Sequence, residues 1–441
     1  MASAEGLAPG REMAARAGMD AVEGGGLSRG VVLLFALACG LSVANIYFAH
    51  PLLDAMARDL AISPAAVGGV VTVTQIGYAL GLIFIVPLGD LMDRRRLVVS
   101  QAVLSAVALT VVGLAPTAFV FLVGMVAVGL LAVVVQVLVV FAATLATPSQ
   151  RGTVVGQVTG GIVTGILLAR FVSGGLADLG GWRSVYLVSA GLTLVMASLL
   201  ARALPRLDPS SSTTYPDLLR SMVVLFREEP LLRVRAVLAL LIFAAFNVLW
   251  APLVLPLTAP PYSLSHTQDG LFGLAGLAWT LGAGRAGRLA DRGLSEWTTG
   301  LSLGLMVIAW LPMAYLTRSL WALVAGVVIL DFGIQAVHVT SQSLLFTRRP
   351  EARSRLVGAY MTFYSVGSAT GAIGATSVYA RAGWLGVCLL GATTSLTALL
   401  FWAATRRRGQ TTEPVGECEL KALRGDCVVH LSRGCEVVHE A

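Results

Sequence analysis

The sequence predicts an all-α polytopic membrane protein in which twelve transmembrane helices form two pseudo-symmetric bundles of six. Three observations lead to this fold class: about twelve apolar runs of membrane length, arginines concentrated in alternate gaps between them, and short motifs that recur in both halves of the chain. A bilayer core about 30 Å thick needs about 20 apolar residues per helical crossing. Because backbone groups in lipid must bond internally, the runs are interpreted as helices.

Composition excludes a soluble protein. Of the 441 residues, 56% are hydrophobic and only 12% are charged, whereas a soluble domain has about 25% charged residues. The net charge of +7 could suggest nucleic acid as a partner. However, the basic residues border the apolar runs, as the positive-inside rule requires, so we expect a lipid bilayer around the chain and no nucleic acid.

The elements follow in chain order. The first run is too long for the apolar core of a signal peptide, so it is retained as a helix, and Arg406, Arg407 and Arg408 end the last one. We predict an N-terminal tail (1–29), an N-terminal bundle (30–204), a linker (205–233), a C-terminal bundle (234–405) and a tail (406–441). The predicted helices span about 30–52, 65–88, 97–114, 118–145, 152–176, 182–204, 234–256, 268–289, 297–316, 319–345, 356–379 and 384–404.

The linker holds a predicted amphipathic helix. Between Asp217 and Phe226, leucine, methionine and phenylalanine recur at helical spacing opposite Arg220 and Arg227. Such a helix lies on a membrane surface with its apolar face buried. We therefore expect it on the cytoplasmic face.

Arginines set the predicted orientation. Alternate gaps hold Arg94 to Arg96, Arg151, the linker arginines, Arg288 with Arg292, and Arg348 to Arg355. The other gaps hold one arginine or none. Because basic loops stay in the cytoplasm, both termini are predicted to be cytoplasmic and the number of crossings to be even.

The two halves of the chain repeat each other. The segment from Gly89 to Arg94 shares Gly, Leu, Asp and Arg with the segment from Gly287 to Arg292. Gly181-Trp182 likewise matches Gly383-Trp384. Such repeats indicate two related bundles with a binding site between them near the bilayer midplane.

The loop after the second run resembles the signature of the major facilitator superfamily, and the loop after the eighth run is a weaker echo of it. A member of this superfamily would have the six-plus-six topology predicted above. The resemblance implies a latch between the bundles, with the arginine as a topological anchor as the alternative. The residues concerned are Gly89, Asp90, Asp93, Arg94, Gly287, Asp291 and Arg292.

The fifth run is similar to a glycine motif of efflux members of that superfamily. Small residues keep the spacing that allows helices to pack closely. Arg170 occupies the place of the family's helix-kinking proline, and Ala169 that of a glycine. The matching positions are Gly156, Gly165, Ala169, Arg170 and Gly174. Runs one and ten look like a bacterial group of sugar or drug efflux permeases, which implies a monomer in the bacterial inner membrane.

A row of polar residues marks the tenth run. Asp331 is about 16 Å from the start of its helix at 1.5 Å per residue. Gln335, His338 and Gln342 follow on the same helical face. Because ionisable groups inside a membrane are costly and face protein or water, we expect this face to line a wet cavity.

Further polar residues complete the candidate cavity. In the family resembled, helices 1, 4, 7 and 10 surround the central cavity, and each carries a polar group here. For any single amide, a hydrogen bond that only joins two helices is the alternative. The candidates for contact with a small-molecule substrate are Asn45, Tyr47, Gln75, Gln136, Asn247, Trp250, Gln335, Gln342, Tyr360 and Tyr364.

Proton coupling needs a group that gains and loses a proton during the cycle. We expect Asp331 to do this, with His338 as one possible partner and His50 as a second candidate. Three roles stay open for Arg170: reaching the membrane surface, offsetting an acid, or binding an anionic substrate.

The function predicted is secondary active transport by alternating access, namely proton-coupled efflux of a drug-like compound or sugar. The alternative is uptake of a sugar or metabolite by a symporter or uniporter, and a non-transporting sensor or scaffold is a third class. We expect neither enzymatic activity nor a cofactor, because the sequence has no Walker loop and no nucleophile–base set. Cys418, Cys427 and Cys435 match no standard zinc spacing, so no metal is expected.

Overall fold

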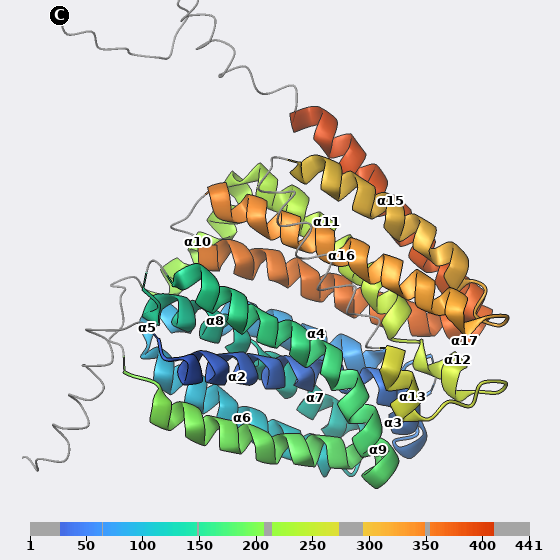
Figure 1. The fold of residues 1–441 in the computed structure, drawn as a ribbon, viewed down its shortest axis with the longest axis horizontal. Coiled ribbons are helices and arrows are strands. Elements are labelled where there is room, and N and C mark those ends of the chain that lie inside the picture. Colours follow the sequence, from blue (N-terminus) through green and yellow to red (C-terminus); the bar gives the residue numbers. More distant parts are fainter. Residues whose placement is uncertain are drawn as a thin grey trace, which may run out of the picture.

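The computed structural model describes residues 27–63, 65–147, 150–206, 214–272, 294–348 and 353–409. Helices form almost all of these segments (Figure 1). The N-terminal bundle contains α2 (Arg29–Tyr47), η1 (His50–Leu52), α3 (Leu53–Asp59), α4 (Gly69–Phe84), α5 (Leu88–Leu91), α6 (Arg94–Gly113), α7 (Ala118–Ala132), α8 (Val134–Leu145) and α9 (Arg151–Ala203). The linker helix α10 (Tyr215–Glu228) leads to α11 (Pro230–Trp250), α12 (Val254–Thr258), α13 (His266–Leu271), α15 (Ser295–Met313), α16 (Leu320–Arg348) and α17 (Arg353–Gly409).

Eight helical stretches in the described part of the chain are long and apolar enough to cross a membrane. Two of them are helices of 53 and 57 residues, α9 and α17. Each bends at one glycine with positive φ, Gly181 at 75° and Gly383 at 62°. Glycine adopts this backbone conformation without the steric cost that a Cβ imposes. The all-helical membrane fold is thus confirmed, whereas the count of twelve crossings stays a prediction.

The repeated Gly-Trp pair has the same place in both halves. After each bend the tryptophan indole donates a hydrogen bond to a neighbouring helix. Trp182 Nε1 donates to Asp59 Oδ2 at 3.1 Å, and Trp384 Nε1 donates to the carbonyl oxygen of Met313 at 2.8 Å. The matched motifs therefore correspond to matched structure, as internal symmetry predicts.

Close helix packing repeats as well. A Cβ at Gly161 or Gly165 of α9 would overlap the backbone of Ala36 or Gly40 on α2. In the second half, Gly367 and Gly371 of α17 lie equally close to the backbone of Leu240 and Ala244 on α11. Small residues four positions apart permit this approach in membrane helices.

Some predicted boundaries were wrong. The first predicted helix ends at Tyr47, and η1 and α3 continue the chain after a break next to Pro51, because proline cannot donate a backbone hydrogen bond. The fourth predicted helix is divided at Val133 into α7 and α8. Most of the eighth predicted helix, and with it Gly287, Asp291 and Arg292, lies outside the described residues, as do the cysteines of the tail.

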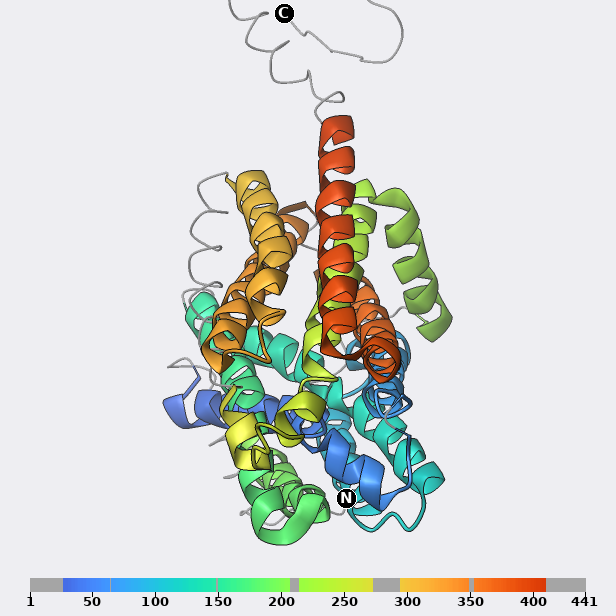
Figure 2. The ribbon, with the colours of Figure 1, turned by 90° about the vertical axis from the view of Figure 1, so that its right-hand side faces the viewer.

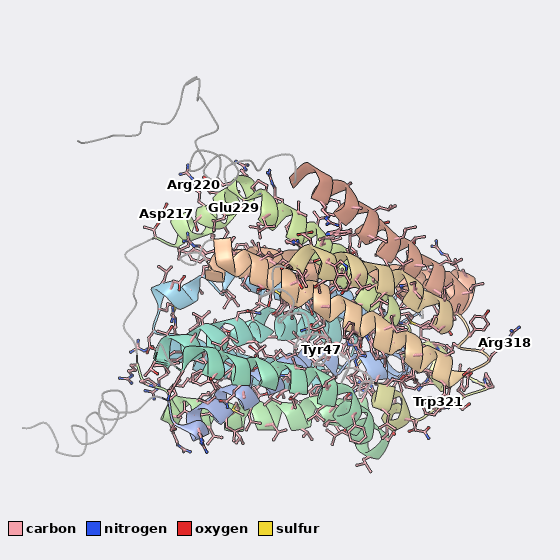
Figure 3. All side chains as sticks on the ribbon, turned by 45° about the horizontal axis from the view of Figure 1, so that its top comes forward. Tyr47, Asp217, Arg220, Glu229, Arg318 and Trp321 are labelled. Carbon is pink, nitrogen blue, oxygen red and sulfur yellow. The ribbon has the colours of Figure 1, made fainter. Side chains whose placement is uncertain are left out.

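The two bundles lie side by side along their length (Figure 1), and Figure 2 views them from the end that carries α12 and α13. We call this end the α13 end and the opposite one the α10 end. Figure 3 shows Asp217, Arg220 and Glu229 at the α10 end, Arg318 and Trp321 at the α13 end, and Tyr47 between them. The positive-inside rule predicts that the α10 end is cytoplasmic.

The linker helix α10 packs against both bundles. Its Phe226 ring stacks on Phe363 of α17 with centroids 5.1 Å apart. Tyr215 Oη donates a hydrogen bond to the carbonyl oxygen of Phe84 at 2.8 Å. The buried residues Leu218 and Leu225 lie on the apolar side of this helix, as the amphipathic pattern predicts.

Candidate functional site

Three residues join the bundles at the centre of the interface. Arg170 of α9 places its guanidinium carbon 3.3 Å from the centre of the Trp250 ring on α11. The Trp250 indole nitrogen donates a hydrogen bond to Asp331 Oδ1 on α16 at 3.2 Å. A cation on an indole face is attracted by the ring quadrupole, most strongly away from water. The contact therefore links the N-terminal bundle to the predicted acid.

Asp331 and Arg170 are both buried, with 1% and 4% of their surface exposed. Their charges interact across Trp250, and Asp269 at the start of the eighth predicted helix interacts with Arg170 as well. Burial excludes the first role considered for Arg170, because a side chain that reaches the membrane surface would be exposed. The arrangement fits the second role, in which the arginine offsets an acid.

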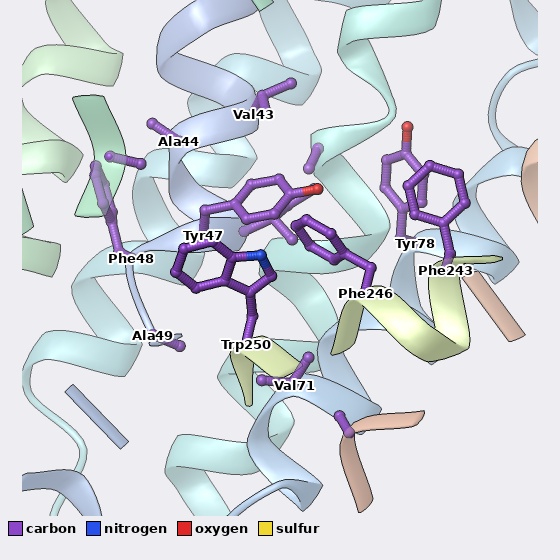
Figure 4. Packing of buried hydrophobic residues seen from close by; sticks show 14 of the residues in the cluster. Val43, Ala44, Tyr47, Phe48, Ala49, Val71, Tyr78, Phe243, Phe246 and Trp250 are labelled. Atoms are coloured by element: carbon purple, nitrogen blue, oxygen red, sulfur yellow. The ribbon is translucent and has the colours of Figure 1, made fainter. Parts of the chain in front are cut away.

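Other bonds connect predicted cavity residues across the interface. Tyr47 and Tyr364 join their hydroxyl groups at 2.8 Å, and His50 Nε2 lies 3.3 Å from Asn247 Oδ1. Gln75 hydrogen-bonds to Tyr364 as well. Figure 4 shows Tyr47 facing rings from α11. The structure thus brings together at one place side chains that the sequence distributes over five helices.

The polar row of α16 differs from its prediction in two ways. His338 Nδ1 lies 3.0 Å from Tyr360 Oη on α17, so His338 is not the partner of Asp331. Seven residues of helix separate the two by about 10 Å, beyond the reach of a direct bond. Asp331 and Gln335 are enclosed by protein, 1% and 6% exposed, and do not face water in this conformation.

Not every predicted cavity residue faces the other bundle. Asn45 Oδ1 accepts a hydrogen bond from Ser189 within the N-terminal bundle, at 2.6 Å. This contact matches the alternative of a bond that only joins two helices. Gln342 is partly buried on α16, one helical turn beyond His338.

At the α13 end the bundles are in tight contact. His266 of α13 bonds through Nε2 to Asp54 at 3.0 Å and through Nδ1 to Asp178 at 3.2 Å. Thr267 also donates its amide hydrogen to Asp178 at 2.9 Å. Gly174 of α9 approaches the backbone of His266 so closely that a Cβ would overlap it. This end of the interface is therefore closed.

A second set of contacts closes the same end between α4 and α17. Thr72 Oγ1 donates to the carbonyl oxygen of Ala369 at 2.8 Å, and Thr376 Oγ1 donates to that of Ala65 at 3.2 Å. A Cβ at Gly68 would overlap Ala372. Backbone therefore meets backbone here with little room for solvent.

At the α10 end the interface holds a pocket. Residues from α4, α5, α6 and α8 form one side of it, and residues from α10 and α17 form the other. Gln136 lines the pocket and donates a hydrogen bond to Tyr78 Oη at 3.2 Å, and the Tyr78 ring lies 6.3 Å from that of Tyr364. The polar and charged lining residues are Asp90, Arg94, Gln136 and Arg355.

The signature loop stays within its own bundle in this conformation. Arg94 donates to the carbonyl oxygen of Gly89 at 3.0 Å and to Thr144 Oγ1 at 2.7 Å, and it pairs with Asp90 at 3.4 Å. Asp93 caps α6 by accepting the amide hydrogen of Arg95 at 3.0 Å. The latch between the bundles stays a prediction.

The glycine motif of the fifth run makes contacts of unequal closeness. Gly165 packs on α2 and Gly174 on α13, whereas a Cβ at Gly156 would have no neighbour within 4 Å among the described residues. Ala169 is buried beside Arg170. The motif residues of α9 that lie toward the α13 end are therefore closely packed, whereas Gly156, toward the α10 end, is not.

Sequence reasoning missed several residues of the interface. Phe246 packs near both Tyr47 and Trp250, with its ring centroid 6.4 Å from that of Tyr47 and 6.2 Å from that of Trp250. It is one apolar residue in a run of them, so no local signal distinguishes it. Asp54, Asp178 and His266 were missed although each is an ionisable residue at the edge of an apolar run, which was a usable signal.

Comparison with known proteins identifies the family. A family model described as Major Facilitator Superfamily matches residues 33–350 and 286–429. The chain belongs to the major facilitator superfamily. This result confirms the predicted family, and with it the interpretation of the chain as a multi-pass membrane transporter and not an enzyme.

Several relatives are named as transporters. The chain is 44% identical over 376 residues to the uncharacterized transporter YgaY of Escherichia coli, covering 85% of this chain and 95% of YgaY. It is 33% identical to the transporter SCO4007 of Streptomyces coelicolor, covering 87% and 89%. The multidrug resistance protein MdtG of Citrobacter koseri is 25% identical, covering 85% and 95%.

Solved structures share the fold. A bacterial homolog of the human lysosomal transporter Spinster, in an inward-facing conformation, superposes with a TM-score of 0.71 at 16% identity, covering 86% of this chain and 96% of that one. The human organic anion transporter MFSD10 gives 0.63 at 19% identity, covering 85% and 99%. These superpositions show that the chain shares the fold of these transporters.

Proposed function

We propose that this superfamily member is a secondary active transporter that exports a small organic solute by alternating access in exchange for protons. The observation that supports the proposal most directly is the chain of contacts from Arg170 through Trp250 to Asp331. It places a buried carboxyl group at the contact between the two bundles, where a change of protonation alters how the bundles attract each other.

Alternating access needs an interface that is closed at one end and open at the other. The α13 end is joined by hydrogen bonds and close backbone contacts, and the α10 end holds the pocket. In the bacterial inner membrane, with the α10 end facing the cytoplasm, this conformation receives solute from the cytoplasm. The reverse conformation would release the solute outside.

Efflux is supported by two likenesses. The glycine spacing of α9 resembles that of efflux members, and the relative MdtG is named a multidrug resistance protein. In this cycle Asp331 takes up a proton from outside and releases it inside. His50 and His338 are the candidates for relaying it, and the chain acts as a monomer.

Uptake by proton symport is the second candidate, and one observation favours it. Arg170 and Asp331 interact as opposite charges, so protonation of Asp331 leaves the arginine with one counter-charge fewer. A negatively charged solute would then bind more readily when the proton is bound. Solute and proton that bind together move in the same direction.

Replacing Asp331 tests the proposal. We expect Asp331→Asn to abolish solute flux driven by a pH gradient in proteoliposomes, because an amide cannot cycle a proton at this site. The solute is chosen beforehand by the melting-temperature shift it causes, from sugars, amphiphilic cations, amino acids and organic anions. Undiminished gradient-driven flux in a folded Asp331→Asn protein would remove this residue from the mechanism.

The matched control is Asp217→Asn. It makes the same chemical change on the linker helix, where the Asp217 carboxylate accepts a hydrogen bond from the exposed side chain of Thr214 at 2.5 Å. We expect its flux to equal that of the unaltered protein. A loss of flux in both variants would point to a general effect of charge on reconstitution.

A further inference from the structure

Two of the N–H donors on the buried Arg170 guanidinium form no hydrogen bond with the described residues. Its Nε and Nη2 have no hydrogen-bond partner in the described part of the chain, although the side chain is only 4% exposed. Charged donors left unpaired inside protein are costly, more so than neutral ones. Two such donors without an acceptor among the described residues are available to a bound acceptor.

The positions of the two unpaired donors indicate which chemical group they can bind. Nε and Nη2 lie on the same edge of the planar guanidinium, and their N–H bonds point in the same direction. A carboxylate matches this edge with two parallel hydrogen bonds. The Trp250 ring covers one face of the guanidinium, its centre 3.3 Å from the guanidinium carbon, so an anion is expected at the edge.

The neighbouring acids do not occupy that edge. Asp331 accepts its hydrogen bond from Trp250, and both Asp331 and Asp269 interact with Arg170 through charge. They lower the cost of burying the cation and leave Nε and Nη2 unpaired. Their role in balancing charge is thus compatible with a ligand at the edge.

Aromatic side chains surround the arginine. The Phe246 ring centre lies 5.8 Å from the guanidinium carbon, and the rings of Tyr47 and Trp250 lie 6.4 and 6.2 Å from that of Phe246 (Figure 4). Binding sites for small organic molecules combine such apolar walls with few polar groups that fix orientation. The walls here fit an aromatic or aliphatic body attached to the charged group.

We propose that Arg170 is the substrate-binding residue for an organic monocarboxylate, held by the Nε–Nη2 edge with its apolar body among Tyr47, Phe246 and Trp250. The proposal rests on the transport part of the proposed function, since the interface must be the path of the solute, and not on the direction in which the proton moves. The path from the pocket at the α10 end leads past Tyr78 and Tyr364 to Tyr47, so these tyrosines must move aside for the anion to enter.

Binding of the anion should be accompanied by uptake of a proton by the protein. The charged and titratable groups that interact with Arg170 are Asp331, Asp269, Tyr47 and His50. A carboxylate at the edge adds a negative charge next to these acids, and protonation of Asp331 removes one. Because linkage is reciprocal, the anion binds more tightly at low pH and the proton binds more tightly with the anion present. This coupling favours the symport candidate.

The site is tested by comparing the affinities of three carboxylic acids with those of their neutral amides. Benzoate, 1-naphthoate and 4-phenylbutyrate, each paired with the corresponding amide, are titrated calorimetrically into the purified full-length protein at pH 5.5 and 7.5. We expect at least one acid to bind at pH 5.5 at least about tenfold more tightly than its amide. Arg170→Gln should weaken that acid by about 10- to 100-fold, the range for a lost charge-assisted pair of hydrogen bonds.

Further variants keep the test decisive if Arg170→Gln does not fold. Arg170→Lys retains the charge without the two-donor edge and should weaken the acid by about tenfold. Asp331→Asn should bind the acid more tightly at pH 7.5 than the unaltered protein does, with a weaker dependence on pH. Arg318→Gln changes an exposed arginine at the α13 end and should have no effect.

The outcomes separate this inference from the proposed function. Acids that bind no better than their amides, or equally well to the Arg170 variants, would overturn the anion site even if another solute shows proton-coupled flux. Acid binding that depends on Arg170, in a protein without gradient-driven flux, would support the site and contradict proton-coupled transport.

Discussion

The two ends of the interface between the bundles are built differently. At the α13 end, ionisable side chains from three helices and close glycine contacts join one bundle to the other. At the α10 end, the signature loop bonds within its own bundle, and a pocket lies between that bundle and α10 with α17. We therefore expect the state of this transporter to depend on a few contacts at the α13 end, and these contacts can be changed one at a time.

The largest expected effect comes from forcing the α13 end apart. Gly174→Ala would place a Cβ against the backbone of His266, which cannot move without moving α13. Overpacking costs about 1–3 kcal/mol, which would shift the equilibrium between closed and open α13 ends by about 5- to 150-fold. Distances between spin labels at Leu179 and Trp321, both exposed at this end, should lengthen.

Gly156→Ala is the matched control for this change. It adds the same methyl group to α9 where no described atom lies within 4 Å. The distance between the labels should remain as in the unaltered protein. Equal distances in both glycine variants and the unaltered protein would contradict the close contact at the α13 end.

A smaller effect is expected from the His266 network. Hydrogen bonding to Asp54 raises the pKa of His266 above its ordinary value near 6.5. When the α13 end opens, these partners are lost and the pKa returns toward the ordinary value. Protonated His266 therefore stabilises closure below pH 6.5, and the contribution is lost as pH rises through the raised pKa. The fraction of protein with an open α13 end, measured by the distance between the spin labels, should therefore increase at high pH.

His266→Gln tests the source of this pH dependence. It removes the titrating group, so closure should weaken by about 1 kcal/mol, roughly fivefold, and its dependence on pH near neutrality should flatten. A pH response of the label distances that is unaltered in this variant would assign it to another group, such as the acids near Arg170.

The smallest effect is expected at Thr72. Thr72→Val removes its hydrogen bond to the carbonyl oxygen of Ala369 and keeps the shape of the side chain. Hydrogen bonds between membrane helices contribute about 0.6 kcal/mol on average, so the closed population should fall by about threefold. Thr370→Val is its control, because the Thr370 hydroxyl bonds only to backbone of its own helix in the described structure.

The sequence predicted most of the helices and their internal symmetry. Apolar length located the helices, and the Gly181-Trp182 and Gly383-Trp384 pairs located two equivalent bends. Predicted ends failed where a run of apolar residues continues past a break, as at Pro51 and Val133. Hydropathy does not register such breaks, because the residues on both sides are equally apolar.

The candidate site was predicted less completely. Asp331 and Tyr364 were recognised because polar groups inside a membrane are costly. Tyr47 and Trp250 were recognised as cavity candidates, but their pairings were not, since Trp250 bonds to Asp331 from another helix and Tyr47 bonds to Tyr364 across 317 residues of chain. His338 was one option for the partner of Asp331 because both lie on one face, whereas it bonds to Tyr360 on the next helix.

The sequence by itself determined that this chain is a helical membrane protein of the major facilitator superfamily, because apolar length and motif spacing are properties of neighbouring residues. The tertiary structure alone decided that Arg170 meets Trp250 and Asp331, and that the α13 end is closed while the α10 end holds a pocket. Hydrogen bonds and cation–π contacts act over a few ångströms, so they depend on how whole helices pack. No local pattern specifies that packing.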